Sequence, residues 1–193
     1  MQFTSDWFSW HKDKWDKYIS ELSIKDNLRC LEIGSFEGRS TLYILQNYCK
    51  GNNSTIDCID TWNGSVEHDK NIYDLDNLYN RFINNTKEYI DNKKLVINRG
   101  ESKQILIQFL YNNKQKYDFI YVDGSHLACD VLMDVVLSWE LLKDNGIMIF
   151  DDYNWGNGNH ETTAPAINGF LNSFVGKYEI LLLDYQLHIR KLC

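Results

Sequence analysis

The chain contains 193 residues, with 27 acidic and 20 basic side chains and a formal net charge of −7. This length suits a single domain that buries a core of its own without disulfides or a structural metal. The acidic balance, with lysines scattered along the chain, argues against a nucleic-acid partner. Since no apolar run approaches the roughly 18 residues of a membrane span, no membrane partner is expected either.

The cysteines and the first residues favour a reducing compartment. The five cysteines are odd in number and include no Cys-x-x-Cys pair, so a disulfide framework is not indicated. The N-terminus carries neither a basic nor an apolar region, and no targeting segment is expected. Both observations predict a cytoplasmic location.

The first predicted element is an amphipathic helix over 5–22. Thr4, Ser5 and Asp6 are candidate N-caps, and Trp7, Trp10 and Trp15 recur at intervals of three to five residues. Such a stripe usually packs in a core, although it could also line a pocket for a substrate.

Further along, short apolar runs alternate with segments of helical period, which is the pattern of a mostly parallel sheet. Strands are predicted over 28–33, 55–60, 94–98, 118–122 and 147–150. Helices are predicted over 39–48, 72–90, 102–111 and 127–139, the last closed by Asn145-Gly146. A helix near 166–174 follows, and the runs 178–183 and 186–189 are expected to form an antiparallel hairpin.

Ligands of open α/β sheets bind beyond the carboxyl ends of the strands, so the residues after each strand carry the functional signal. The first strand leads into a turn with Gly34 and Gly38. The middle glycine of the dinucleotide-binding G-x-G-x-x-G is missing, which disfavours a nicotinamide dehydrogenase. The two glycines alone fit a tight turn or a ligand-binding loop. Asp60, which ends the second strand and could accept both hydroxyls of a ribose, favours the ligand.

Four segments resemble the class I S-adenosylmethionine-dependent methyltransferases, in particular the small macrocin-type and catechol-type O-methyltransferases. The segments are 31–41, 100–102, 117–126 and 139–153. The resemblance implies an α/β, Rossmann-like fold with a mostly parallel seven-stranded sheet of order 3-2-1-4-5-7-6, helices on both faces and a C-terminal antiparallel hairpin. It also implies one methyltransferase domain over 1–193, with an N-terminal helical cap (1–24) and a catalytic core (25–193).

The same resemblance implies which residues bind S-adenosylmethionine. The glycine turn wraps the methionine part, Asp60 holds the ribose, and the turn at 100–102 lines the adenine. The position of Trp62 suits contact with the adenosine edge. The predicted cofactor-binding residues are Glu32, Gly34, Ser35, Gly38, Ser40, Thr41, Asp60, Thr61, Trp62, Gly100, Glu101, Ser102, Asp123 and His126.

Three carboxylates form a candidate metal site. Asp123 follows the fourth strand, and Asp151 and Asp152 follow the fifth. Adjacent strands would bring them together, where their mutual repulsion is costly without a cation. Oxygen ligands suit Mg²⁺ or a similar hard divalent ion, and metal-dependent members of the family carry acids at these positions. The simpler alternative is that Asp123 caps a helix and the pair begins a solvated loop.

The candidate catalytic residues are Asp123, His126 and His160. His126 stands where catechol-type relatives carry a lysine proposed as general base, and a histidine can transfer a proton near neutral pH. A histidine in the first turn of a helix is equally often a surface or packing residue. His160 lies in the polar loop after the fifth strand, which could close over the acceptor.

The sequence therefore predicts a metal-assisted methyl transfer to a hydroxyl of a small polar molecule such as a sugar. The alternatives are a metal-independent enzyme or one with altered chemistry on the same fold, and a non-catalytic cofactor-binding subunit. The small domain and its many aromatic side chains favour a homodimer.

Overall fold

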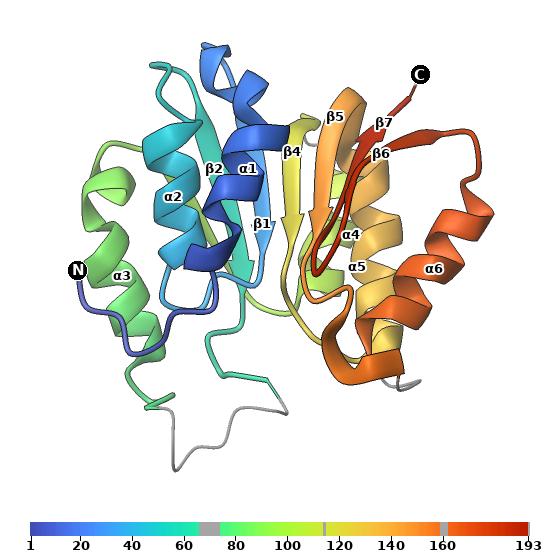
Figure 1. Cartoon of the computed structure of the whole chain (residues 1–193). Helices are drawn as coiled ribbons and strands as arrows, with labels where there is room; N and C mark the ends of the chain where they lie inside the picture. Colours follow the sequence, from blue (N-terminus) through green and yellow to red (C-terminus); the bar gives the residue numbers. More distant parts are fainter. Residues whose placement is uncertain (66–73, 114, 159–161, 193) are drawn as a thin grey trace.

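The computed structural model describes residues 1–65, 74–113, 115–158 and 162–192. In these ranges one seven-stranded sheet has the order β3-β2-β1-β4-β5-β7-β6, with helices on both faces (Figure 1). The strands are β1 Arg29–Ile33, β2 Thr55–Asp60, β3 Leu95–Arg99, β4 Tyr117–Val122, β5 Leu142–Phe150, β6 Tyr178–Leu183 and β7 Leu187–Lys191. The α-helices are α1 Lys12–Tyr18, α2 Arg39–Asn47, α3 Leu78–Asp91, α4 Ser102–Tyr111, α5 Ala128–Leu141 and α6 Thr163–Ser173.

The pairing of the strands confirms the predicted fold. The strands β3, β2, β1, β4 and β5 run parallel to one another, whereas β7 lies antiparallel to both β5 and β6. Parallel neighbours require crossover connections, which the helices between them supply, and only the last two strands form a hairpin. The carboxyl ends of the five parallel strands therefore meet at one edge of the sheet.

The sheet separates two apolar cores. One contains buried side chains of α1, α2 and α3, and the other contains those of α4, α5 and α6. Successive side chains of β4 alternate between them, since Phe119 and Tyr121 face the first core while Ile120 and Val122 face the second. Burial of β4 on both faces explains why its sequence is continuously apolar from Phe119 to Val122.

The N-terminal segment is not the single helix over 5–22 that the sequence predicts. It forms the 3₁₀-helix η1 Ser9–His11, the helix α1 and a second 3₁₀-helix, η2 Ser20–Ile24. Among the three capping candidates, Asp6 accepts the backbone N–H groups of Phe8 and Ser9 at 3.3 and 2.9 Å, although the N-cap position of η1 is Phe8. Ile19 then interrupts the helix with φ −127° and ψ 14°. Its fully buried, β-branched side chain shows that packing overrides the helical period here.

Helix α3 begins at Leu78, later than the predicted start at 72. Residues 74–77 precede it, and Asp74 accepts hydrogen bonds from the backbone of Asn77 at 3.3 Å and from Arg81 at 2.8 Å. A carboxylate that bonds nearby groups in this way favours a turn over a helix interior. The predicted helical residues 72 and 73 lie outside the described residues.

Asn145 and Gly146 do not close α5 as predicted. The helix ends at Leu141, and β5 begins at the next residue, five residues before its predicted start. Asn145 has φ +60° and lies where the register between β4 and β5 shifts. The Asn-Gly pair therefore permits an irregularity within strand β5. Such an irregularity requires a residue with positive φ, as the end of a helix does.

Helix α6 and its surroundings differ from the prediction in one respect. The helix begins at Thr163, three residues before the predicted start, because Pro165 is tolerated in the first turn of a helix. A further 3₁₀-helix, η3 Trp155–Gly158, precedes it.

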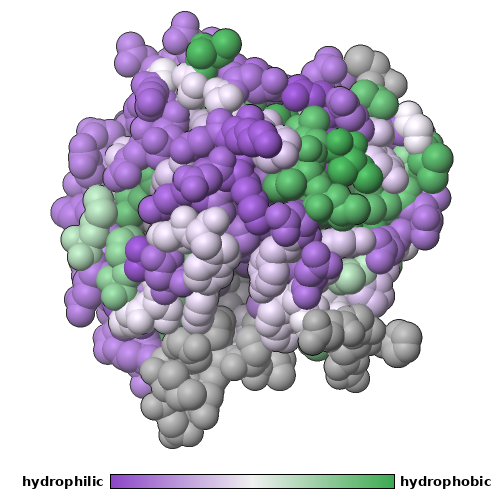
Figure 2. Space-filling model, viewed as in Figure 1, coloured by the Kyte–Doolittle hydropathy of each residue, from purple (hydrophilic) through white to green (hydrophobic). Residues whose placement is uncertain are grey.

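The edge strand β6 carries an exposed apolar surface. Figure 2 shows an apolar region over the C-terminal strands, and Ile180 and Leu183 of β6 are 47% and 59% exposed. Among the described residues, the structure contains no helix with both the length and the apolarity that crossing a membrane requires.

We expect the substitution Gly34→Ala to lower the free energy of unfolding by about 2 kcal/mol or more. Gly34 has φ +84°, and an added Cβ would lie 1.7 Å from the carbonyl oxygen of Asp123. The matched control is Gly169→Ala in α6, where an added Cβ meets nothing within 4 Å and alanine should stabilise the helix by about 0.5–1 kcal/mol. Urea unfolding measures both. Equal effects of the two substitutions would contradict the close approach at Gly34.

Candidate active site

A cavity of about 700 Å³ opens at the carboxyl ends of the parallel strands. Among its lining residues are most of those predicted to bind the cofactor, namely Gly34, Ser35, Ser40, Asp60, Thr61, Gly100, Glu101, Ser102, Asp123 and His126. All three predicted metal ligands line it as well. The predicted catalytic residue His160 lies outside the described residues.

The other four predicted cofactor residues, Glu32, Gly38, Thr41 and Trp62, do not line the cavity. The carboxylate of Glu32 is completely buried and accepts hydrogen bonds from the hydroxyls of Ser35, Ser40 and Thr41. Burial is the main cause that raises the pKa of Glu32, and these hydrogen bonds lower it. Glu32 therefore supports the cavity wall from behind by fixing the start of α2.

Trp62 also lies behind the wall, so the structure does not place it against an adenosine edge. It is 2% exposed, contacts Phe82 with ring centroids 4.7 Å apart and the rings tilted by 45°, and donates its indole N–H to the carbonyl of Phe36 at 2.9 Å. The large buried ring of Trp62 packs beneath the loop that follows β1, so its role here is in packing.

Asp60 ties the glycine loop to the end of β2. Its carboxylate accepts the backbone N–H groups of Ser35 and Phe36 at 2.8 and 2.9 Å and that of Trp62 at 2.7 Å. The residue lines the cavity, so a carboxylate stands where the sequence predicts the ribose. Its contact with a ribose stays a prediction.

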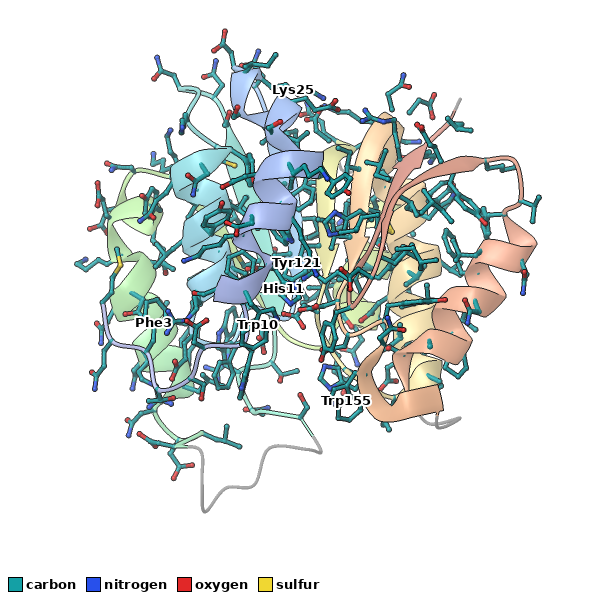
Figure 3. The ribbon with its side chains drawn as sticks, in the orientation of Figure 1. Phe3, Trp10, His11, Lys25, Tyr121 and Trp155 are labelled. Atoms are coloured by element: carbon teal, nitrogen blue, oxygen red, sulfur yellow. The ribbon has the colours of Figure 1, made fainter. Side chains whose placement is uncertain are left out.

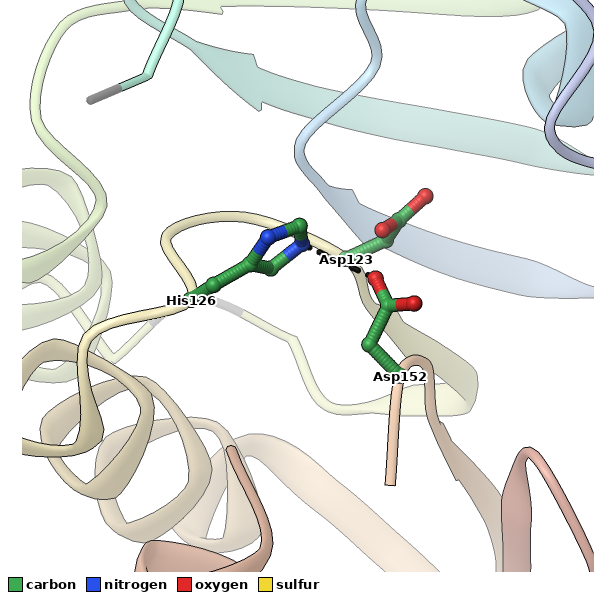
Figure 4. Close-up of side chains that lie close together, drawn as sticks. All are labelled: Asp123, His126 and Asp152. Carbon is green, nitrogen blue, oxygen red and sulfur yellow. Dashed lines mark ion pairs between the residues drawn. The ribbon is translucent and has the colours of Figure 1, made fainter. Parts of the chain in front are cut away.

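Asp123, His126 and Asp152 form the group that could hold a metal ion. Each offers one ligand atom, and the three atoms lie within 4.8 Å of one another. Nε2 of His126 lies 2.9 Å from a carboxylate oxygen of Asp152 (Figure 4). The hydroxyl of Tyr185 donates to the other oxygen of Asp152 at 2.6 Å, which fixes the orientation of this carboxylate.

Asp151, expected to complete a set of three acids, lines the cavity but is not part of this group. Its side chain accepts hydrogen bonds from the hydroxyl of Tyr121 and from the amide of Gln186 at 2.9 Å, and Nε2 of His11 lies 3.8 Å away. Among the described residues, the group that can share one ion therefore contains His126 in place of Asp151. Asp151 and Asp152 lie in the turn after β5, where Asp152 has φ +53°, so the alternation of a strand does not set the directions of their side chains.

The three acids nevertheless repel one another, as the sequence predicts. Burial, followed by the charges of Asp151 and Asp152, raises the pKa of Asp123 well above its usual value. Burial and the charge of Asp152 raise the pKa of Asp151 to about 6. A cation beside these carboxylates would relieve the repulsion.

Aromatic side chains surround the mouth of the cavity. Trp7, Trp10 and Trp155 line it and are 42%, 56% and 37% exposed, whereas Trp15 is fully buried in the core. Figure 3 shows Trp10 and Trp155 at the end of the sheet where the parallel strands terminate. The tryptophan stripe of the N-terminal segment is thus divided between the cavity and the core. Trp155 is not among the residues predicted from the sequence, although the polar loop that carries it was expected to close over the acceptor.

Comparison with known proteins identifies the family. Residues 31–153 match the family model described as a methyltransferase domain. A protein of Acanthamoeba polyphaga mimivirus, named only as uncharacterized, is 27% identical over 160 residues, which cover 80% of this chain and 64% of that protein.

Solved structures share the fold at low identity. The MycE methyltransferase of the mycinamycin biosynthetic pathway, in complex with Mg and SAH, gives a TM-score of 0.64 at 14% identity, covering 97% of this chain and 51% of MycE. The O-methyltransferase of Bacillus cereus, in complex with SAH, gives 0.70 at 12% identity, covering 98% of this chain and 84% of that one. This chain therefore spans about half the length of MycE.

The strand order and the cavity beyond the strands define a class I methyltransferase fold. Because the family model covers more than half of the chain, the chain belongs to the methyltransferase-domain family, the class I S-adenosylmethionine-dependent methyltransferases.

We expect the buried acids to contribute to the free energy of unfolding, measured with EDTA present, a part that falls as the pH rises from about 4 to above about 6. His11 and His188, whose pKa values burial lowers to about 4 and about 3, act in the opposite direction, so the part from the acids is read from the difference between wild type and variant. The pKa of Asp151 is raised from 3.8 to about 6, and that of Asp123 is also raised. At these two acids the folded protein therefore binds protons more tightly than the unfolded chain, and this contribution disappears as the acids ionise. Urea unfolding at several pH values measures the fall.

The variant Asp152→Asn should reduce this fall, because it removes a charge that repels both other acids. Asp91→Asn is the matched control, since its carboxylate is 60% exposed and pairs with Lys87 at the surface, where such pairs contribute little. A pH dependence that Asp152→Asn leaves unchanged would show that the acids do not repel one another.

Proposed function

We propose that this domain transfers the methyl group of S-adenosylmethionine to a hydroxyl oxygen of a small polar acceptor, assisted by a divalent cation. The observation that carries the proposal is the group of Asp123, His126 and Asp152, whose ligand atoms lie within 4.8 Å of one another at the wall of the cavity. Two of the similar structures support it, since one is named as an O-methyltransferase and the other contains Mg.

The residues present fit a divalent cation. The acids that raise one another's pKa would be stabilised by a positive charge. Two carboxylates suit Mg²⁺, and the imidazole of His126 also admits Mn²⁺. When bound, the cation would lower the pKa of an acceptor hydroxyl and orient its oxygen.

The remaining residues would orient the two substrates. Tyr185 holds Asp152, while the rings of Trp7, Trp10 and Trp155 form an apolar wall beside the acids. Such a wall suits the apolar face of a sugar or another ring that also carries hydroxyls, and it helps exclude water from the reacting atoms. A small-molecule acceptor therefore remains our proposal over a nucleic acid, given the net charge of −7.

Two roles are possible for His126, and a single ring nitrogen cannot perform both. The nitrogen Nε2, which faces Asp152 at 2.9 Å, can ligate the cation or accept the proton of the acceptor hydroxyl, but a lone pair cannot do both. We place it at the cation. The general-base role stays the alternative, and the homodimer and the cytoplasmic location stay predictions.

We expect EDTA to abolish methyl transfer and Mg²⁺ or Mn²⁺ to restore it. In an acceptor screen read out by release of S-adenosylhomocysteine, Asp152→Asn should lower turnover by about 100-fold or more, because it removes a ligand of the cation. Electron paramagnetic resonance of added Mn²⁺ provides a readout that needs no acceptor, and it should show one bound ion in the wild-type protein and weaker binding in the variant.

The matched control is Asp91→Asn, which should leave both turnover and Mn²⁺ binding unchanged because Asp91 is remote from the cavity lining. Full turnover in EDTA would contradict the cation, and it would favour the metal-independent alternative.

A further inference from the structure

Asp134 is a buried acid at the cavity that the proposed chemistry does not use. It lies in α5, is 2% exposed and lines the cavity. Its carboxyl forms a hydrogen bond with the side chain of Ser102. Among the described residues, however, its Oδ1 atom has no hydrogen-bond partner.

An unpaired buried carboxyl oxygen destabilises a fold, because it loses its hydration without gaining a partner. Burial raises the pKa of Asp134 to about 7, with the hydrogen bond from Ser102 acting in the opposite direction. An alanine at this helical position would avoid the cost. The buried acceptor is therefore best explained by a donor that arrives with a ligand.

The position of Asp134 indicates which part of the ligand supplies this donor. Ser102 begins α4 within the turn that the sequence predicts to line the adenine. An added Cβ on Gly124, in the loop after β4, would lie 3.4 Å from Oδ2 of Asp134. The carboxyl thus faces the loops after β3 and β4 together.

The part of the cavity at Ser102 and Asp134 is connected to Asp60, the residue predicted to hold the ribose. The backbone N–H of Gly100 donates to the carbonyl of Asp60 at 2.9 Å, so the turn that leads to Ser102 begins beside Asp60. A ligand whose ribose lies at Asp60 and whose methyl group points toward Asp123 would extend its base toward Ser102 and Asp134.

We propose that Oδ1 of Asp134 accepts a hydrogen bond from the exocyclic amino group of the cofactor's adenine, and so makes the site select adenine over purines without that group. The inference rests on the proposed cofactor. Asp134 touches the base, far from the methyl group in the ligand, and it is a specificity residue without a part in the chemistry.

The test compares S-adenosylhomocysteine with its 6-deamino analogue, in which a hydrogen replaces the amino group, by isothermal titration calorimetry. The wild-type protein should bind the analogue about tenfold more weakly, because the buried acceptor then stays unpaired. In Asp134→Ala the two ligands should bind with affinities within about twofold of each other, because the acceptor is gone.

The matched control is Asp130→Ala, one turn earlier in α5. Asp130 also lines the cavity, but its carboxylate already accepts the hydroxyl of Ser125 at 2.9 Å, so the tenfold preference should persist. Asp134→Ser serves as a second variant if the alanine protein does not fold. A purely structural role of Asp134 would change stability without changing the ratio of the two affinities.

The outcomes separate this inference from the proposed function. Equal binding of both ligands by the wild-type protein, or an unchanged ratio in a folded Asp134 variant, overturns the role of Asp134 alone. Failure of the wild-type protein to bind S-adenosylhomocysteine at all overturns the cofactor and this inference together.

Discussion

The continuation of the sheet's hydrogen bonding past the strand ends is the constraint on which the rest of the site depends. The backbone N–H groups of Gly34, Gly100, Asp123 and Asp151, each the first residue after a strand, donate to a neighbouring strand at 2.8–2.9 Å. Because of these bonds, four loops leave the sheet in register. The side chains after strands that are far apart in sequence are thereby placed around one cavity. Gly34 must be a glycine because the first loop passes directly over the backbone of Asp123.

The sequence predicts the strands and the positions that follow them, because both depend on local patterns. Burial on both faces makes β4 continuously apolar from Phe119 to Val122, and the strand order follows from the resemblance. The interruption at Ile19 and the irregularity at Asn145 were not predictable in this way. The first depends on how α1 packs against the sheet, and an Asn-Gly pair has the same local preference for positive φ at a helix end and within a strand.

The direction of individual side chains was also beyond the sequence. The acids after β4 and β5 were predictable, but only the structure shows that Asp151 turns toward Tyr121 and Gln186 while His126 reaches Asp152. The burial of Glu32 behind the wall and the unpaired oxygen of Asp134 are likewise properties of the packed state. Glu32 supports the cavity wall from behind, and we propose that Asp123 and Asp152 bind the cation and that Asp134 recognises the base.

We propose that this cavity binds the S-adenosyl ligand with its ribose at Asp60. Isothermal titration calorimetry of S-adenosylhomocysteine against the wild-type protein and Asp60→Asn tests it most directly. We expect one binding site per chain for S-adenosylhomocysteine. Its affinity for the variant should be about tenfold or more weaker, since a charged acceptor is lost. Equal affinity in the two proteins would place the ribose elsewhere. The absence of binding to the wild-type protein would contradict the proposal that this cavity binds the cofactor.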